Sequence, residues 1–104
     1  MATTSEVKIT VLRKLYHADL YEQYGVTTGA PCSAVEVGQE FIVPKDLRMP
    51  PGFCSWAWRD IGAYLVTLAR GGDFVGSRPG MFVASCADGY RPVLFKLERV
   101  QATE

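Results

Sequence analysis

The sequence predicts an α+β fold, in which a small antiparallel sheet of about four strands is covered on one face by one main helix spanning about residues 55–70. Val7, Ile9 and Val11 alternate with Lys8, Thr10 and Leu12, a period of two that is typical of a half-buried strand. A stripe of apolar residues at helical spacing follows Ser55. Two more strand-like runs, 81–86 and 91–100, flank an Asp-Gly pair that favours a tight hairpin. Strands that are not alternating regularly with helices favour the α+β class.

The first half of the chain is predicted to hold two strands and a short helix or structured turn. After the strand at Val7 to Leu12, the segment from Leu15 to Tyr24 spaces its apolar residues more widely, and Gly25 is a suitable helix terminator. Residues 25–32 are rich in turn formers, and β-type composition resumes before Pro44. We therefore expect the second strand at about Glu40 to Val43.

A pinned loop and the main helix follow. Residues 44–53 contain three prolines and a glycine, which preclude regular structure. Ser55 is expected to be the N-cap of the helix, and Gly71-Gly72 to end it. The stripe that should face the sheet consists of Trp58, Ile61, Leu65, Leu68 and Ala69.

The last two strands are expected to form a hairpin with Asp88-Gly89 as a two-residue loop. This register places Cys86 opposite Arg91. It also places one set of residues on the core face, namely Phe82, Ala84, Val93, Phe95 and Leu97. Because Pro92 cannot donate to a ladder, its strand either lies at a sheet edge or starts there. Leu94, on the outer face, is a candidate contact in a homo-oligomer.

Length and composition indicate a single domain over residues 1–104, with an ordered core at about 6–100 and a frayed end at 101–104. Eleven basic residues balance eleven acidic ones, which argues against nucleic acid as a partner. No apolar run approaches the roughly 20 residues of a spanning helix, so we expect no membrane partner. The first residues have neither a basic nor an apolar leader region, which predicts a cytoplasmic location.

Three cysteines are the main candidates for chemistry: Cys32 follows a turn, Cys54 precedes the main helix, and Cys86 ends a strand. They lie 22 and 32 positions apart, so close metal-ligand spacing is absent. Cysteine is often a small core side chain, and that interpretation stays open. Sites are, however, built at loops and element ends. If the three thiols converge, thiolate ligands suit zinc or copper(I).

Several neighbours of these cysteines are candidate catalytic residues. A thiol at the start of a helix faces free N–H groups that favour the thiolate, which makes Cys54 the first candidate nucleophile. Asp60, Asp88 and His17, the single histidine, are candidates for proton transfer. Asp88 has an ordinary role as a turn former as well. Arg91 is expected to hold an anionic group of a substrate.

The tryptophan pair Trp56 and Trp58 supplies a candidate binding wall. Positions two apart lie on nearly opposite sides of a helix, so both rings cannot face the core. Trp58 belongs to the apolar stripe. Trp56, together with Phe53, is therefore predicted to line an apolar cleft near Cys54. The alternative is that Trp56 lies partly exposed over the proline loop without a binding role.

Three blocks of the sequence carry a resemblance: Gly29-Ala-Pro-Cys32 followed by Val37–Val43, Met49–Trp58, and Cys86–Arg99. In this order they resemble a family of short prokaryotic proteins, many from anaerobes, whose function is unassigned. The likeness extends from about Val7 to Val100. It implies a cysteine at each of the three matching positions, an aromatic pair matching the two tryptophans, and an Asp-Gly-x-Arg-Pro-Val segment. The resemblance therefore implies that the cysteines act together.

This chain departs from the family pattern at three positions. The family usually has a proline after each of the first two cysteines, where this chain has Ser33 and Ser55. It often has a second cysteine before the third, where this chain has Ser85. A metal site that depended on that doublet would be incomplete here.

Three hypotheses about function follow. The first is a site in which Cys32, Cys54 and Cys86 bind a small ligand or a soft metal ion. The second is a small cofactor-free enzyme with Cys54 as nucleophile or acid, the aspartates or His17 as proton carriers, and Arg91 as anion holder. The third is a structural or interaction module whose cysteines only pack. Disulfides are not expected in a cytoplasmic protein.

Overall fold

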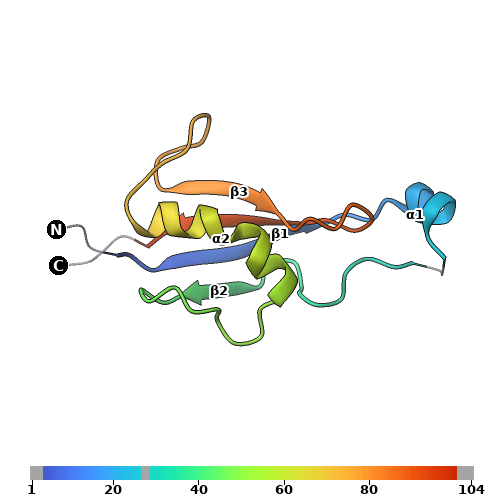
Figure 1. The fold of residues 1–104 in the computed structure, drawn as a ribbon, viewed down its shortest axis with the longest axis horizontal. Coiled ribbons are helices and arrows are strands. Elements are labelled where there is room, and N and C mark those ends of the chain that lie inside the picture. The colour runs from blue at the N-terminus through green and yellow to red at the C-terminus, as the bar shows by residue number, and fades with distance from the viewer. Residues whose placement is uncertain (1–3, 27–28, 101–104) are drawn as a thin grey trace.

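A computed structural model describes residues 4–26 and 29–100, and it confirms the α+β class (Figure 1). Within these residues a four-stranded antiparallel sheet has the strand order β2-β1-β4-β3. The expected frayed end at 101–104 lies outside the described residues. In the part described, no helix has the length and apolar character needed to cross a membrane. The elements are β1 (Val7–Lys14), α1 (Ala18–Tyr24), β2 (Glu40–Val43), α2 (Ser55–Ala69), β3 (Met81–Ser85) and β4 (Val93–Arg99).

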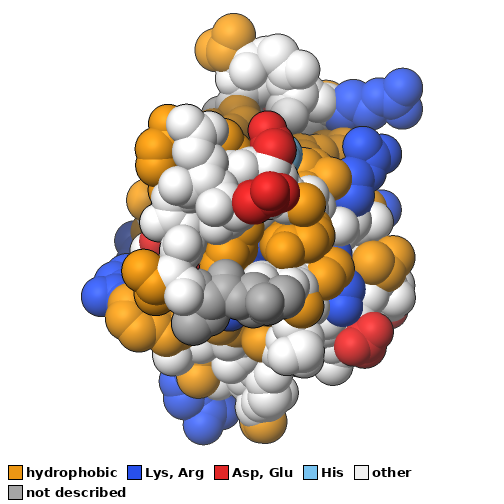
Figure 2. Space-filling model, turned by 90° about the vertical axis from the view of Figure 1, so that its right-hand side faces the viewer, with side chains coloured by type: hydrophobic (Ala, Val, Ile, Leu, Met, Phe, Trp, Pro, Cys, Tyr) orange, Lys and Arg blue, Asp and Glu red, His pale blue; other side chains and the backbone are white. Residues whose placement is uncertain are grey.

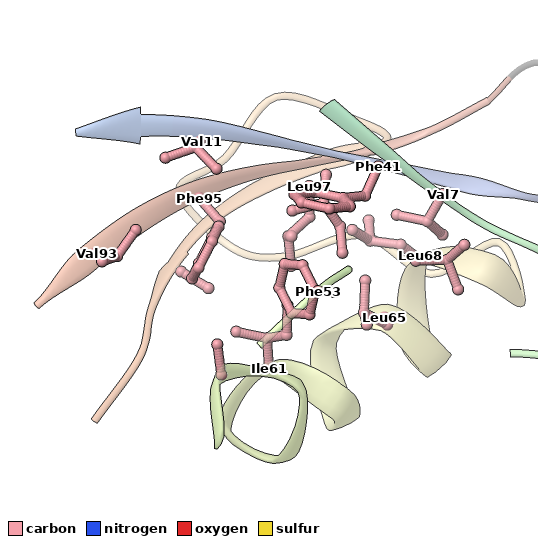
Figure 3. Packing of buried hydrophobic residues seen from close by; sticks show 14 of the residues in the cluster. Val7, Val11, Phe41, Phe53, Ile61, Leu65, Leu68, Val93, Phe95 and Leu97 are labelled. Atoms are coloured by element: carbon pink, nitrogen blue, oxygen red, sulfur yellow. The ribbon is translucent and has the colours of Figure 1, made fainter. Parts of the chain in front are cut away.

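The hydrophobic core lies between α2 and one face of the sheet (Figure 3). The predicted apolar stripe of α2 supplies Ile61, Leu65 and Leu68, which are all buried. Alternate residues of the strands, including Ile9 and Phe95, face them. Each such side chain stabilises the fold by about 1.5–3 kcal/mol when fully buried. The helical and strand periodicities of the sequence therefore meet in one apolar layer.

The start of α2 differs from the prediction, because Cys54 and not Ser55 is the N-cap. Ser55 is already the first helical residue, and the Cys54 side chain makes no capping hydrogen bond. Phe53 immediately before the cap is buried and packs edge-on against Trp58, with ring centroids 6.2 Å apart. This pairing across the first turn is a hydrophobic staple. Burial of Phe53 thus sets where the helix begins, and it overrides the capping preference of serine.

The end of α2 is as predicted. Arg70 is the C-cap, and Gly71 follows with a φ of 93°, a left-handed conformation that glycine adopts at little cost. The N–H of Gly71 donates to Leu68 O at 3.1 Å, and the N–H of Gly72 donates to Thr67 O at 2.8 Å. These two bonds form a Schellman motif, which satisfies carbonyls that the helix leaves free.

The β3–β4 hairpin has the predicted core face but a different register. Ser85 pairs with Leu94, and Cys86 N donates to Val93 O at 3.1 Å, so Cys86 does not lie opposite Arg91 as predicted. The connection occupies residues 87–92. Asp88 Oδ1 accepts hydrogen bonds from the N–H groups of Tyr90 and Arg91, which lie beyond the expected two-residue loop. The shift is by two residues and so leaves every side chain on its predicted face.

Pro92 precedes β4, which is an inner strand between β1 and β3. Of the two explanations that the sequence left open for this proline, the position at the start of the strand is the correct one. The ring cannot donate to the ladder, but its carbonyl accepts a hydrogen bond from Leu15 N at 2.8 Å.

An arm projects from this end of the sheet and carries α1, at the right of Figure 1. His17 N donates to Tyr90 O at 2.8 Å, which holds the chain beyond β1 beside the β3–β4 connection. The Tyr21 ring of α1 lies 4.7 Å from the Tyr90 ring, centroid to centroid. None of the residues of α1 is buried. The radius of gyration, 15.1 Å, accordingly exceeds the roughly 13 Å of a compact chain of this length.

Hydrophobic side chains reach the surface at the arm end of the molecule, which Figure 2 views from the right-hand side of Figure 1. They include Leu20, Tyr24 and Val26. On the sheet face opposite α2, Leu94 lies half-buried. The expected homo-oligomer contact at Leu94 stays a prediction.

Candidate functional site

A pocket of about 570 Å³ lies where the first turn of α2 meets the ends of β3 and β4 and the segment 32–35. Its walls include Cys32, Cys54 and Cys86, three residues from three separate parts of the chain. We call it the thiol pocket. The volume falls in the range of about 300–1,000 Å³ that is typical of small-molecule sites.

Each cysteine is held differently, and all three are unbridged and partly buried. The Cys86 Sγ accepts a hydrogen bond from Val93 N at 3.3 Å, next to the last backbone bond of the hairpin. The Cys32 Sγ accepts one from Ala34 N at 3.4 Å. Cys54 occupies the N-cap of α2 without a capping bond from its side chain. The three cysteine side chains pack against the core, and they also line the pocket.

The two aspartates of the pocket both accept hydrogen bonds from other residues of the chain. Asp60 Oδ2 accepts a hydrogen bond from Ala87 N at 2.8 Å, and this bond connects α2 to the β3–β4 connection. Asp88 Oδ2 accepts a bond from Arg91 Nε at 3.3 Å. Arg91 also donates to Ala30 O at 3.5 Å. These residues, which we expected to move protons or hold an anion, thus fasten the loops that form the walls.

The apolar part of the lining includes four residues that the sequence analysis assigned to the core or did not single out, namely Val35, Ala57, Val93 and Phe95. Trp56 lines the pocket as predicted, although 71% of its surface is exposed. The Arg59 guanidinium lies over the Trp56 ring, 4.7 Å from its centroid. Positions three apart on a helix are neighbours, and this spacing was the signal that could have identified Arg59.

Two predicted site residues lie elsewhere. Phe53 is not part of the pocket lining, because its ring is buried in the core 5.0 Å from Phe41 and 5.4 Å from Phe95, centroid to centroid. His17 is also absent from the lining. It is the N-cap of α1, in the projecting arm. A proton relay from His17 to Cys54 therefore has no support in the geometry.

Comparison with known proteins gives no assignment: no protein-family model matches the chain, no curated protein matches it in sequence, and no solved structure matches it. The resemblance in the three cysteine blocks stays a prediction.

The described residues contain no group of three or more histidine, cysteine, aspartate or glutamate side chains that could hold a metal ion. The three thiols share a pocket in this arrangement, but they do not form a ligand set. Binding of zinc or copper(I) by Cys32, Cys54 and Cys86 stays a prediction.

Proposed function

We propose that the thiol pocket binds a small organic molecule with a largely apolar body. The observation that carries this proposal is that Cys32, Cys54 and Cys86 line one pocket of about 570 Å³ although they are far apart in the sequence. Cysteines that served only to fill the core would be fully buried, whereas these are partly exposed. The absence of a ligand set among the described residues favours an organic ligand over a soft metal ion.

A second candidate function is covalent capture of an electrophilic ligand by Cys54. The N-cap position places its thiol at the positive end of the α2 dipole, and no capping bond occupies the side chain.

The free thiols also support a cytoplasmic location, because unbridged cysteines are typical of reducing compartments.

The test uses a neutral apolar fluorophore, phenylnaphthylamine, titrated into the protein. Ala34→Trp places a bulky ring in the lining at an exposed position and should weaken dye binding about tenfold or more. Ala63→Trp on an exposed position of α2 outside the lining is the matched control and should leave it unchanged. Equal binding by both variants, or no binding by the unmodified protein, would contradict the proposal.

Alkylation by iodoacetamide distinguishes the alternatives. In variants that retain a single cysteine, bound dye should slow the alkylation of each thiol. Rapid reaction of Cys54 alone would support covalent capture. If all three cysteines can be replaced by alanine without loss of dye affinity, they only pack. Stoichiometric zinc binding that each Cys→Ser substitution abolishes would instead establish a metal site.

A further inference from the structure

The charged side chains in the thiol pocket are not equally available to a ligand. Four of them belong to the lining: Arg59, Asp60, Asp88 and Arg91. Asp88 and Arg91 form an ion pair of 3.3 Å, and Asp60 accepts the N–H of Ala87. In the described part of the chain, no carboxylate lies within ion-pair distance of Arg59. Among the described residues, Arg59 is thus the lining cation whose charge has no ion-pair partner.

The position of Arg59 on Trp56 also suits it to bind a ligand. The guanidinium lies 4.7 Å from the ring centroid, a distance at which the ring face attracts a cation. A guanidinium above a ring keeps its N–H donors in its own plane, where they can pair with two oxygens of one acid group. Holding Arg59 in this way reduces the entropy lost when a ligand binds.

The start of α2, the helix that carries Arg59, adds partial positive charge to the pocket. Cys54 and Trp56 both belong to the lining and lie on the first turn of this helix. The first N–H groups of a helix have no partner within it, and the Cys54 side chain does not cap them. The lining outside α2 includes the apolar side chains of Val35, Val93 and Phe95.

We infer that the ligand of the thiol pocket is an organic anion whose single acid group pairs with Arg59 at the rim while its apolar body lies against the thiols and the core. This inference rests on the proposed binding function of the pocket and specifies its ligand class. A carboxylate, sulfonate or phosphate ester has the required chemistry. Arg91 is the less suitable partner, because Asp88 already neutralises it.

Two dyes with the same aromatic body separate the inference from the proposal on which it rests. Anilinonaphthalene sulfonate carries one negative charge, and phenylnaphthylamine carries none. Arg59→Gln should weaken binding of the sulfonate about fivefold, the upper range for an exposed ion pair. The same variant should leave the affinity for the neutral dye within about twofold, because the apolar contacts remain.

Matched variants exclude indirect effects. Arg78→Gln removes one positive charge at an exposed position outside the pocket and should leave both affinities unchanged. Arg59→Lys keeps the charge without the planar fork and should bind the sulfonate with intermediate affinity. Near-ultraviolet circular dichroism confirms that each variant is folded. Added salt should weaken sulfonate binding by the unmodified protein more than by Arg59→Gln.

The outcomes are distinct. If the unmodified protein and Arg59→Gln bind the sulfonate equally while both bind the neutral dye, the inference is wrong and the pocket proposal stands. If the unmodified protein binds neither dye, the pocket proposal fails and the inference fails with it. A loss of both dyes in Arg59→Gln, with the fold retained, would assign to Arg59 a role in shaping the pocket and not in selecting an anion.

Discussion

The carboxylate of Asp60 accepts a hydrogen bond from the backbone N–H of Ala87, with 2.8 Å between Oδ2 and N. The two residues belong to α2 and to the β3–β4 connection, and both line the thiol pocket. Their contact fixes the distance between the helix that carries Cys54 and the loop that follows Cys86. Asp60 therefore positions the walls of the pocket, and its part in proton transfer stays a prediction.

Replacement of Asp60 by alanine should loosen this connection. A hydrogen bond to a charged acceptor contributes about 1.5–3 kcal/mol, and partial exposure of Asp60 places the expected loss of unfolding free energy near the lower value. Asp60→Asn keeps an acceptor oxygen and should lose less. Urea denaturation measures the stability, and titration with phenylnaphthylamine measures the pocket. Unchanged stability and dye affinity in Asp60→Ala would show that the contact does not hold the wall.

Phe53 and Trp56 should respond oppositely to truncation although they lie three residues apart. Phe53→Ala removes a buried ring and should cost about 3–5 kcal/mol of unfolding free energy. Trp56→Ala removes an exposed ring and should cost about 0.5 kcal/mol or less, while weakening dye binding. Phe53→Leu serves if the alanine variant does not fold. A larger loss of stability in Trp56→Ala than in Phe53→Leu would contradict this assignment.

Acid should reveal the contribution of Asp73 to stability. The hydrogen bond from Gly80 N, and then that from the Arg99 side chain, lower the pKa of Asp73 below its ordinary value. A lowered pKa in the folded state stabilises the fold at every pH above the unfolded value of about 3.9, and this contribution is lost as the pH falls through the folded value.

The variant Asp73→Asn should accordingly be less stable than the unmodified protein near neutral pH. The difference should shrink as the pH falls below about 4. Urea midpoints measured across this range provide the check. A difference that stays constant into strong acid would mean that ionisation of Asp73 does not stabilise the fold.

Gly25→Ala should disturb the projecting arm without lowering the stability of the sheet. A Cβ on Gly25 would lie 2.5 Å from the Tyr21 Cδ1 and 2.7 Å from the Tyr21 backbone O, so Gly25→Ala has to displace both the ring that packs against Tyr90 and the backbone at the end of α1. Because α1 buries none of its residues, the unfolding free energy of the whole protein should change by about 0.5 kcal/mol or less. Limited proteolysis should then cut the arm faster.

Gly62→Ala is the matched control for that substitution. Apart from its chain neighbours and the nearby backbone of α2, a Cβ at Gly62 would meet no described atom within 4 Å. Alanine at this helical position should stabilise the protein by about 0.5–1 kcal/mol. If Gly25→Ala instead lowers the urea midpoint strongly and leaves the proteolysis of the arm unchanged, the arm is part of the cooperative fold.

Local patterns in the sequence were sufficient for most of the fold. The period of two in β1, the apolar stripe of α2 and the glycine pair after Arg70 each depend on interactions within a few residues, and the structure confirms all three. The hairpin loop is the element that its local sequence did not predict correctly. Asp-Gly favours a two-residue loop, but the side-chain bonds of Asp88 produce a longer connection while the core face is kept.

The thiol pocket depended on contacts between distant segments. Sequence reasoning suggested that Cys32, Cys54 and Cys86 converge, but their spacing did not establish it; the chain paths around the sheet bring them to one pocket. Likewise, the burial of Phe53 in the core and the contact of Asp60 with Ala87 both depend on segments that are distant in the sequence. Secondary structure follows from neighbours along the chain, whereas a pocket forms only when apolar burial and hydrogen bonds have set the positions of segments that the sequence keeps apart.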